Sequence, residues 1–399
     1  MLRVNDTRRL LDREGYAYIA IEEEPQQPEL SQYRFLDIVP ELERGPSRAR
    51  EVAKCYLYKH QLEALRALEE GKNVILIAGT GSGKTESWAL YTLRHRARTL
   101  AIYPTLALAE DQFDRLKSYV KALGGYEVLK VDASIVDEYN KRFGVRARAK
   151  LGEELSRALI VVTNPAFLMA DFKRFATRGT SWLSEFIRDV DLIVVDEIDF
   201  YGSSRATLLL VLIELIVRFI ARKRPRIAVL GATLGNPSDV AKYLTEINGR
   251  ATVIIRGKAM KVLNRWILIV GKNIATIRDI ARKIVNERSD LAVYRPFVED
   301  EELFLRYVHV IVEELRKLGY RVPEPAIEPE KIIAHYVLSD EDGVTLVFTP
   351  SIRSAERLAA RIKALLPPEL HHKVAVHHHL VPKNVRSEIE ERLQRGRLR

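Results

Sequence analysis

Short apolar runs alternate with amphipathic stretches through the middle of the chain. The run Asn73–Ile77 reads NVILI, and after a glycine-rich turn the apolar residues take helical spacing over Thr85–His95. Such runs recur as far as residue 230, and helical patterns, beginning with Gln61–Glu70, separate most of them. Continuous apolar strands that alternate with helices are typical of a parallel sheet covered on both faces. The further predicted strands are Leu100–Tyr103, Glu127–Val131, Ala158–Val162, Leu192–Val195 and Arg226–Leu230.

The pattern changes at about residue 250. Ala251–Val270 reads as one or two strands, and two amphipathic helices follow it. A second strand-and-helix pattern then opens at Gly343–Phe348, which reads GVTLVF, and contains too few strands for a complete α/β domain. The predicted elements of this part are helices at Ile274–Asn286, Asp300–Leu318, Ser351–Leu366 and Lys383–Gln394 and strands at Gly343–Phe348 and near Lys373–Val376.

These patterns divide the chain into three parts. Residues 1–50 are predicted as a charged N-terminal extension packed on the first domain, with prolines that break any long helix. Residues 51–250 are predicted as one α/β domain, and residues 251–399 as a linker, a helical insertion and an incomplete second α/β domain. The insertion, about residues 274–330, is either an accessory module or a buttress for the second domain.

Composition adds a charge bias and excludes some kinds of site. The net charge is +10, which favours a polyanionic partner but equally fits a basic protein without one. The single cysteine, Cys55, cannot form an intramolecular disulfide or a cysteine-based zinc or iron–sulfur site. The N-terminus lacks the apolar stretch of a signal peptide, and the longest apolar run, Ala206–Ile220, is short for a membrane span. We expect a cytoplasmic protein.

The turn after the first predicted strand reads AGTGSGKT and opens a helix, which is the context that a phosphate-binding loop requires. Its glycines let the backbone N–H groups point at phosphates, and the helix N-terminus favours an anion. Lys84 is expected to reach the β- and γ-phosphates of ATP, and the Thr85 hydroxyl to bind Mg²⁺. The predicted phosphate-binding residues are Ala78, Gly79, Thr80, Gly81, Ser82, Gly83, Lys84 and Thr85.

An acidic turn supplies the second half of this site, in the sequence LIVVDEID that ends at Asp199. Asp196 is placed to hold magnesium, directly or through water, and Glu197 to polarise the attacking water as general base. Acidic turns after strands are common, but together with the phosphate-binding loop this one indicates ATP hydrolysis. Lys84, Asp196 and Glu197 are therefore the predicted catalytic residues, with Thr85 and Asp196 as metal ligands.

The order of these motifs resembles the first motor domain of superfamily 2 DEAD/H-box helicases. YKHQLEAL, which starts at Tyr58, resembles the adenine-reading glutamine motif; by that resemblance Gln61 contacts the adenine edge, and Tyr56 or Tyr58 stacks on its face. YPTLALAEDQ and VVTNPAFLM resemble motifs Ia and Ib, which grip the nucleic-acid backbone. The resemblance implies nucleic-acid contacts by Pro104, Thr105, Gln112, Thr163 and Asn164.

GATLGNP, at residues 231–237, resembles motif III, which couples the nucleotide state to the grip on nucleic acid. Gly231 replaces the usual serine and removes one hydroxyl, so that the coupling role rests on Thr233. The coupling residues implied by the resemblance are Asp199, Gly231, Ala232 and Thr233.

The combined motif sequences over about residues 55–240 most resemble those of the DNA-repair helicase group, and the Lhr-like and Ski2-like helicases are similar groups. The resemblance implies a RecA-like motor domain, ATP and Mg²⁺ as cofactors, and movement along single-stranded or forked nucleic acid. In these groups DNA is the commoner substrate and 3′-to-5′ the usual polarity. TLVFTPSIRSAERLAARI, residues 345–362, resembles motif IV of a second RecA-like domain.

Two motifs that should follow, including the helix with the arginine finger, do not occur before Arg399. We expect either a fragment or a site that another polypeptide completes. The alternative to an ATP-driven helicase is thus a nucleotide-gated nucleic-acid-binding module with weak or no turnover. The histidines near residues 371–379 lack convincing further ligands, so a solvated or nucleic-acid-facing turn is preferred to a metal site.

Overall fold

The computed structural model describes residues 7–104, 106–258, 264–339, 343–378 and 380–398. The chain divides into two compact units. One unit is Glu24–Leu263; the other is Met1–Glu23 together with Asn264–Arg399.

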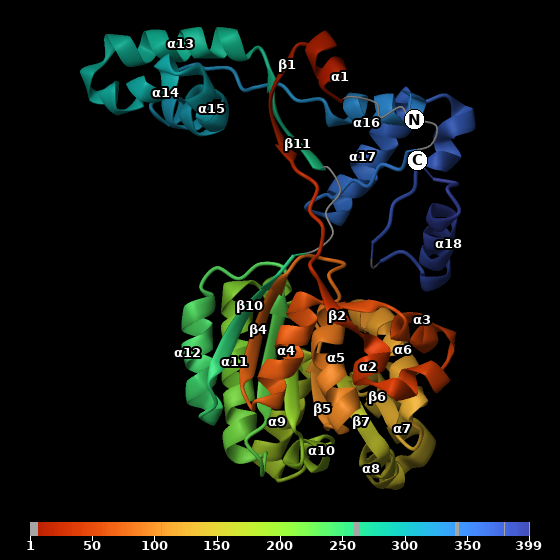
Figure 1. The fold of residues 1–399 in the computed structure, drawn as a ribbon. Helices are drawn as coiled ribbons and strands as arrows, with labels where there is room; N and C mark the ends of the chain where they lie inside the picture. The colour runs from red at the N-terminus through yellow and green to blue at the C-terminus, as the bar shows by residue number, and fades with distance from the viewer. Residues whose placement is uncertain (1–6, 105, 259–263, 340–342, 379, 399) are drawn as a thin grey trace. The chain divides into compact units, whose positions relative to one another are not determined.

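The unit Glu24–Leu263 is built on a sheet of seven parallel strands in the order β10-β4-β9-β8-β5-β7-β6 (Figure 1). This sheet confirms the α/β prediction, and each predicted strand before residue 240 lies on an observed one. The strands are β4 (Asn73–Ala78), β5 (Thr99–Ile102), β6 (Glu127–Lys130), β7 (Ala158–Thr163), β8 (Leu192–Val195), β9 (Arg226–Gly231) and β10 (Thr252–Gly257).

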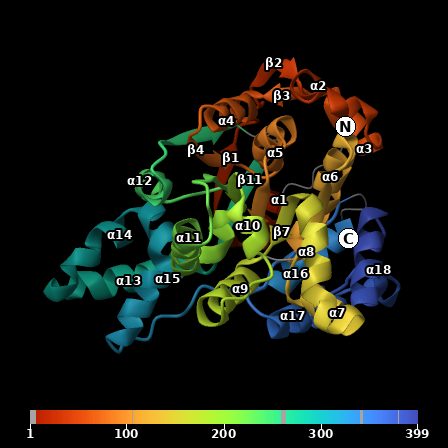
Figure 2. The same cartoon turned by 90° about the horizontal axis from the view of Figure 1, so that it is seen from below.

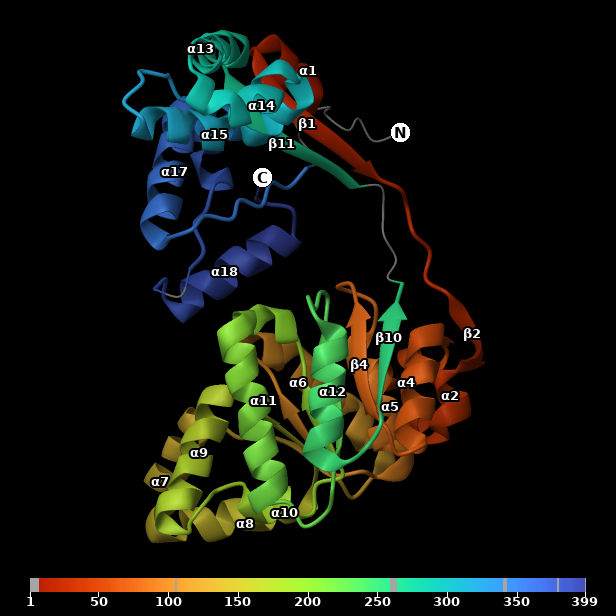
Figure 3. The ribbon, with the colours of Figure 1, turned by 90° about the vertical axis from the view of Figure 1, so that its left-hand side faces the viewer.

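Successive strand residues enter two different apolar clusters, one on each face of the sheet. On β4, Val74 and Leu76 join one cluster and Ile75 joins the other. Both faces are therefore covered by helices, which explains why the strands are continuously apolar (Figure 3). One face carries α4 (Lys59–Glu69), α5 (Lys84–His95) and α6 (Leu106–Leu123); the other carries α7 (Ala133–Phe143), α8 (Ala147–Arg157), α9 (Pro165–Arg178), α10 (Ser184–Arg188), α11 (Gly202–Phe219) and α12 (Pro237–Asn248).

The apolar run expected to form a buried helix is α11. Within the part of the chain that the structure describes, one helical stretch, Ile198–Phe219, is long and apolar enough to cross a membrane, and 33% of its most apolar 18-residue window is buried. Leu212, Ile213 and Ile216 of this helix pack in the sheet's second apolar cluster, whereas Phe219 is exposed. One side of α11 thus belongs to the core of the α/β unit.

The N-terminal residues are shared between the two units. β1 (Tyr16–Glu23) pairs antiparallel with β11 (Asn264–Lys272), and β2 (Leu30–Arg34) pairs with β3 (Tyr56–Tyr58) of the α/β unit. The expectation that the whole extension packs on the first domain is therefore wrong for β1. The same division also falls after β10 and not at residue 250, because β10 pairs with β4. The remaining short elements before residue 60 are α1 (Thr7–Arg13), α2 (Phe35–Ile38), η1 (Pro40–Arg44) and α3 (Ser47–Ala53).

The helical insertion forms its own apolar cluster around residues such as Ile277, Phe304 and Val308. Its helices α13, α14 and α15 pack against one another (Figures 1 and 2). The helices of this unit are α13 (Ile274–Glu287), α14 (Arg295–Glu299), α15 (Glu301–Lys317), α16 (Pro329–Ser339), α17 (Ile352–Leu365) and α18 (Lys383–Gln394), with 3₁₀ turns η4 (Ser289–Tyr294) and η5 (Pro368–Lys373).

The strands predicted at residues 343–348 and 373–376 do not form. The side chain of Phe348 is 92% exposed, and those of Leu346 and Val344 are also exposed. A strand needs a neighbour for its N–H and C=O groups, and among the described residues of this unit none pairs with these segments. The prediction of strands in these two segments is therefore wrong for the described residues.

Candidate nucleotide-binding site

Five neighbouring strands of the sheet end in the predicted motifs. The glycine-rich loop follows β4, the acidic turn follows β8, and the GAT segment begins at the last residue of β9. Motif Ia follows β5, and motif Ib begins on β7. The carboxyl ends of parallel strands meet at one edge, which is where ligands bind in open α/β sheets. The topology thus brings all these segments together.

The loop takes conformations that only glycine adopts without strain. Gly81 and Gly83 have φ angles of 77° and 70°. Gly83 is the N-cap of α5, and a Cβ there would collide with the amide nitrogen of Gln61. Thr80 and Gly81 are exposed at the tip, while Ser82 and the first residues of α5 are buried. The loop therefore curls over a helix N-terminus, as an anion-binding loop must.

Lys84 and Glu197 form an ion pair in this structure. Lys84 Nζ lies 3.1 Å from Glu197 Oε2, and the lysine side chain is 5% exposed. Glu197 adopts a left-handed conformation, with φ 51° and ψ 50°, which is uncommon for a residue with a side chain. The turn is thus held in a strained shape that directs Glu197 toward Lys84.

Asp196 lies behind this pair and is almost completely buried. Its Oδ1 accepts a hydrogen bond from the main-chain N–H of Glu197 at 2.9 Å. Burial and then the negative charge of Glu197 raise the pKa of Asp196 to about 7, against the opposing effect of Lys84. A bound cation would relieve this unfavourable charge. Asp196 and the buried Thr85 hydroxyl are oxygen donors of the kind that magnesium prefers, so the residues fit this metal.

The acidic turn contacts the GAT segment through Asp199. Asp199 Oδ1 accepts the main-chain N–H of Ala232 at 3.1 Å. A Cβ on Gly231 would lie 2.6 Å from the same oxygen and 2.8 Å from Ile198 Cγ2. The contact therefore requires glycine at residue 231, while Thr233 is exposed.

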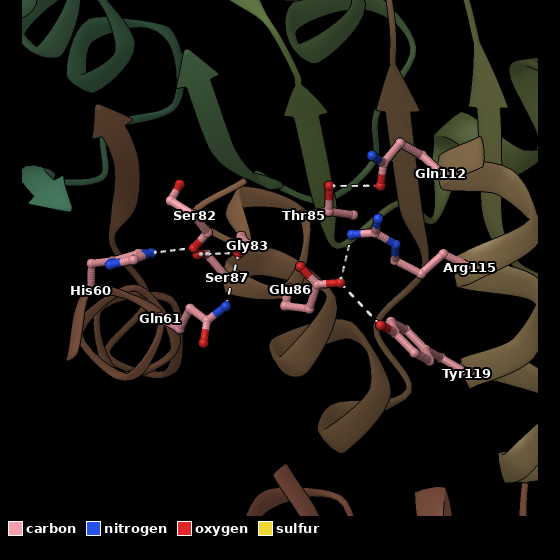
Figure 4. A network of polar contacts seen from close by, with 10 residues as sticks. All are labelled: His60, Gln61, Ser82, Gly83, Thr85, Glu86, Ser87, Gln112, Arg115 and Tyr119. Carbon is pink, nitrogen blue, oxygen red and sulfur yellow. Dashed lines mark hydrogen bonds and ion pairs between the residues drawn. The ribbon is translucent and has the colours of Figure 1, made fainter. Parts of the chain in front are cut away.

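Gln61 and His60 both hold the loop through its carbonyl groups (Figure 4). Gln61 Nε2 donates to Gly83 O at 3.0 Å, and Gln61 Oε1 accepts from Tyr58 N at 2.9 Å. His60 Nε2 lies 2.9 Å from Ser82 O, and the Tyr58 ring stacks on the imidazole. Burial lowers the pKa of His60. The motif thus braces the loop, and the predicted adenine contact by Gln61 stays a prediction.

The first turn of α5 also contacts α6 (Figure 4). Thr85 Oγ1 donates to Gln112 Oε1 at 3.0 Å. Glu86 Oε1 accepts from Arg115 Nη1 at 3.1 Å and from the Tyr119 hydroxyl at 3.0 Å. Gln112, predicted as a nucleic-acid contact, therefore points at the predicted magnesium ligand.

The remaining predicted nucleic-acid contacts are Thr163, Asn164, Pro104 and Thr105. Thr163 is 1% exposed and donates its hydroxyl to Val131 O at 2.7 Å, so its side chain faces inward. Asn164 caps α9 by accepting from Phe167 N at 2.9 Å. Pro104 is half-buried, and Thr105 lies outside the described residues. The contacts of Thr163, Asn164 and Pro104 with the nucleic-acid backbone stay predictions.

Sequence reasoning missed four side chains at this site, namely His60, Glu86, Arg115 and Tyr119. Glu86 is a charged residue followed by a largely apolar stretch of α5, and that contrast was the available signal. Arg115 and Tyr119 lie outside every motif, and only the packing of α6 on α5 brings them to the site.

In the other unit, His377 pairs with Glu390 and His378 pairs with Glu356, at 2.9 Å each.

Residues 58–240 match the family model described as DEAD/DEAH box helicase. The chain is 26% identical over 356 residues to the ATP-dependent helicase Lhr-Core of Methanocaldococcus jannaschii, covering 85% of this chain and 35% of that protein. It is 31% identical over 195 residues to the ATP-dependent DNA helicase Hel308 of Pyrococcus abyssi, covering 47% and 24%. The chain thus spans about a third or less of the length of these two relatives.

A solved structure of the DUF1998 helicase MrfA bound to DNA superposes with a TM-score of 0.65 at 19% identity. The match covers 99% of this chain and 48% of that one. At this level of identity the likeness establishes the fold, including the RecA-like arrangement of the sheet and its helices.

Proposed function

We propose that residues 58–240, which match the DEAD/DEAH box helicase model, are the ATP-binding half of a superfamily 2 nucleic-acid helicase or translocase. The observation that carries the proposal is the ion pair between Lys84 and Glu197, the residue after Asp196. The pair lies at the edge of the sheet formed by the carboxyl ends of the strands, where the glycine-rich loop follows β4. A phosphate-binding lysine, a general base and a metal ligand are the groups that ATP hydrolysis requires.

The geometry suggests an order of events at this site. In this structure one carboxylate oxygen of Glu197 pairs with the Lys84 ammonium. Phosphate oxygens would attract the Lys84 ammonium and release Glu197 to orient the attacking water. Thr85 and Asp196 would hold magnesium, which neutralises charge on the phosphates. Nucleotide binding thereby prepares the base at the moment when its substrate is present.

Coupling to nucleic acid would pass through the Asp199–Ala232 contact. The GAT segment follows β9, next to β8 with its acidic turn, so a shift of the turn moves both. Asn164 and Pro104 lie at the ends of β7 and β5 on the same edge. Backbone contacts of this kind carry little sequence information, so affinity should fall steeply with salt.

We propose that the nucleic acid along which the protein moves is DNA and that the movement runs in the 3′-to-5′ direction. Among the similar proteins, Hel308 is named a DNA helicase, and the MrfA structure contains DNA. The test is strand displacement on matched DNA and RNA duplexes with a 3′ or a 5′ overhang. Preferential displacement of the 3′-tailed DNA duplex is expected, and equal displacement of the RNA duplex would contradict the choice of DNA.

Nucleic-acid-stimulated ATP turnover tests the core of the proposal. Wild type should hydrolyse ATP faster with single-stranded DNA than without it, and Lys84→Ala should abolish both rates. Lys150→Ala, which removes an exposed lysine of the same unit, is the matched control. Nucleotide binding without any turnover would exclude the enzyme and favour the second candidate.

The second candidate is a nucleotide-gated nucleic-acid-binding module with weak turnover. The apolar side chains of residues 344, 346, 347 and 348 favour it, because they are exposed in the unit that resembles the second motor domain. Leu346, Phe348 and Ile362 line a hollow of about 560 Å³ in this unit. Further polypeptide that pairs with residues 343–348 would complete the sheet, and turnover that rises only after its addition would support this candidate.

A further inference from the structure

One face of α6 contacts the first turn of the helix that follows the phosphate-binding loop. Gln112, Arg115 and Tyr119 are spaced three and four residues apart on α6, so they project from one side of it (Figure 4). They contact consecutive residues of α5: Gln112 bonds to Thr85, and the other two bond to Glu86. Tyr119 also packs in the apolar cluster on this face of the sheet, whereas Gln112 and Arg115 are partly buried at the contact.

We propose that Gln112 is a positioning residue for nucleotide-bound magnesium, and that Glu86, Arg115 and Tyr119 form a clamp that keeps it in place. The inference rests on the proposed function, because it takes Thr85 as a residue that binds the metal. A hydroxyl binds a cation through an oxygen lone pair, so its proton has to point elsewhere. The amide oxygen of Gln112 accepts that proton at 3.0 Å and leaves the lone pairs of Thr85 Oγ1 for the cation.

The clamp is rigid because its central carboxylate is buried. The side chain of Glu86 is 8% exposed and that of Arg115 is 26% exposed. A buried carboxylate is costly unless it is paired, and Glu86 Oε1 receives two donors from α6. Its other oxygen, Oε2, lies 3.3 Å from the position of a Cβ on Gly83, so the carboxylate fills the space between the loop and α6. Movement of α6 along α5 would break both bonds to Glu86.

The clamp and Gln112 therefore form one unit. Gln112 lies about one turn of α6 before Arg115, so the position fixed at Glu86 also fixes the amide opposite Thr85. The helix that carries the clamp starts at Leu106, within the segment 103–112 that resembles motif Ia. This assignment moves Gln112 from the nucleic-acid contacts, where its motif placed it, to the metal.

The first experiment measures the affinity of the full chain for a fluorescent non-hydrolysable ATP analogue, with magnesium and with EDTA. In wild type the affinity should rise with magnesium. Gln112→Ala should lose about 10- to 100-fold of the affinity in magnesium, the usual effect of removing a residue that orients a metal ligand. Its affinity in EDTA and its affinity for single-stranded DNA without nucleotide should stay within about twofold of wild type. Gln112→Glu keeps an acceptor oxygen opposite Thr85 and should retain the magnesium response.

The second experiment tests the clamp by the same titrations. Glu86→Ala should reproduce the magnesium-specific loss, and combining it with Gln112→Ala should add little, because the two residues act as one unit. Glu86→Gln keeps an acceptor oxygen and should be milder. Tyr119→Phe removes one hydrogen bond and no ring, so it is the variant of choice if Glu86→Ala does not fold, and it should give a partial loss.

Three outcomes would overturn parts of the proposal. An unchanged magnesium response in Gln112→Ala would remove the positioning role. Loss of single-stranded DNA affinity in that variant, with a normal magnesium response, would return Gln112 to the nucleic-acid contacts. A normal magnesium response in both Glu86→Ala and Tyr119→Phe, beside a defective Gln112→Ala, would remove the clamp. Failure of wild type to bind nucleotide at all would instead refute the proposed function on which the inference rests.

Discussion

The main-chain N–H of Ala232 donates a hydrogen bond to Asp199 Oδ1 at 3.1 Å. This bond joins the turn after β8 to the end of β9, and it needs a close approach of these two segments. A Cβ on Gly231 would lie 2.6 Å from the same carboxylate oxygen. The contact therefore requires glycine at residue 231, and the link runs through a main-chain amide without a side-chain hydroxyl.

Gly231→Ala should weaken this link. The new methyl group has no room, so Asp199 or Ile198 has to move, which costs about 1–3 kcal/mol of unfolding free energy as in other overpacked sites. The stimulation of ATP turnover by single-stranded DNA should fall, while nucleotide affinity stays near wild type. Denaturant unfolding and turnover with and without DNA measure both effects.

The matched control for this variant is Gly235→Ala. A Cβ at residue 235 meets nothing within 4 Å, so both its stability and its DNA stimulation should match wild type. Wild-type DNA stimulation in Gly231→Ala would show that the Asp199–Ala232 contact does not couple the two activities.

Glu197→Gln should separate nucleotide binding from hydrolysis. The amide cannot accept a proton from water, so turnover should fall by about 10²- to 10⁴-fold. It also loses the charge that pairs with Lys84, which leaves the lysine free for phosphate and should preserve or raise ATP affinity. Equilibrium nucleotide binding and steady-state turnover check this, with the exposed Glu185→Gln as control. Turnover within tenfold of wild type would assign the general base to another residue.

The features that the sequence predicted well are local ones. The run NVILI followed by glycines and Lys84 is a strand, a loop and a helix start within a dozen residues, and apolar burial alone specifies it. The alternation of strands and helices then determines that the loop and the acidic turn reach one edge of the sheet. Both halves of the site were therefore predictable without knowledge of any long-range contact.

The features that it missed depend on partners far along the chain. β1 pairs with β11, and the strand pattern of Tyr16–Glu23 does not say which strand it joins. Gln112 matched a nucleic-acid motif, but the packing of α6 turns it toward Thr85. Residues 344–348 have a strand pattern, but no strand among the described residues of their unit pairs with them, so propensity without a neighbouring strand leaves the segment irregular.

Asn73→Ala should destabilise the α/β unit without changing its chemistry. Asn73 is completely buried at the start of β4, where its Nδ2 donates to Asn248 Oδ1 at 3.0 Å and its Oδ1 accepts from Ile227 N at 2.9 Å. Removal of the amide leaves these buried groups unpaired, at a cost of about 1–3 kcal/mol for each group affected. The free energy of unfolding should fall by at least about 2 kcal/mol.

The site of this change lies at the end of the strand opposite the glycine-rich loop, so the variant that still folds should bind ATP as wild type does. Thr177→Ala, which removes an exposed hydroxyl bonded only locally to Lys173 O, is the control and should change stability by less than about 0.5 kcal/mol. A similar small effect in Asn73→Ala would mean that water replaces the amide.

His60 should make the α/β unit less stable in mild acid. Its pKa is lowered from 6.5 by burial, although Ser82 O and the charge of Glu63 act in the opposite direction. The unfolded chain therefore takes up a proton as the pH falls through about 6.5, before the folded protein does, and the free energy of unfolding decreases with falling pH in that window. Below the lowered pKa of the folded state both states are protonated, and this contribution becomes constant.

His60→Gln removes the titration, so the slope of the unfolding free energy against pH between about pH 7.5 and 5.5 should be shallower than in wild type. Denaturant unfolding across this pH range measures wild type and variant, and an equally steep slope in His60→Gln would assign the acid sensitivity to other groups.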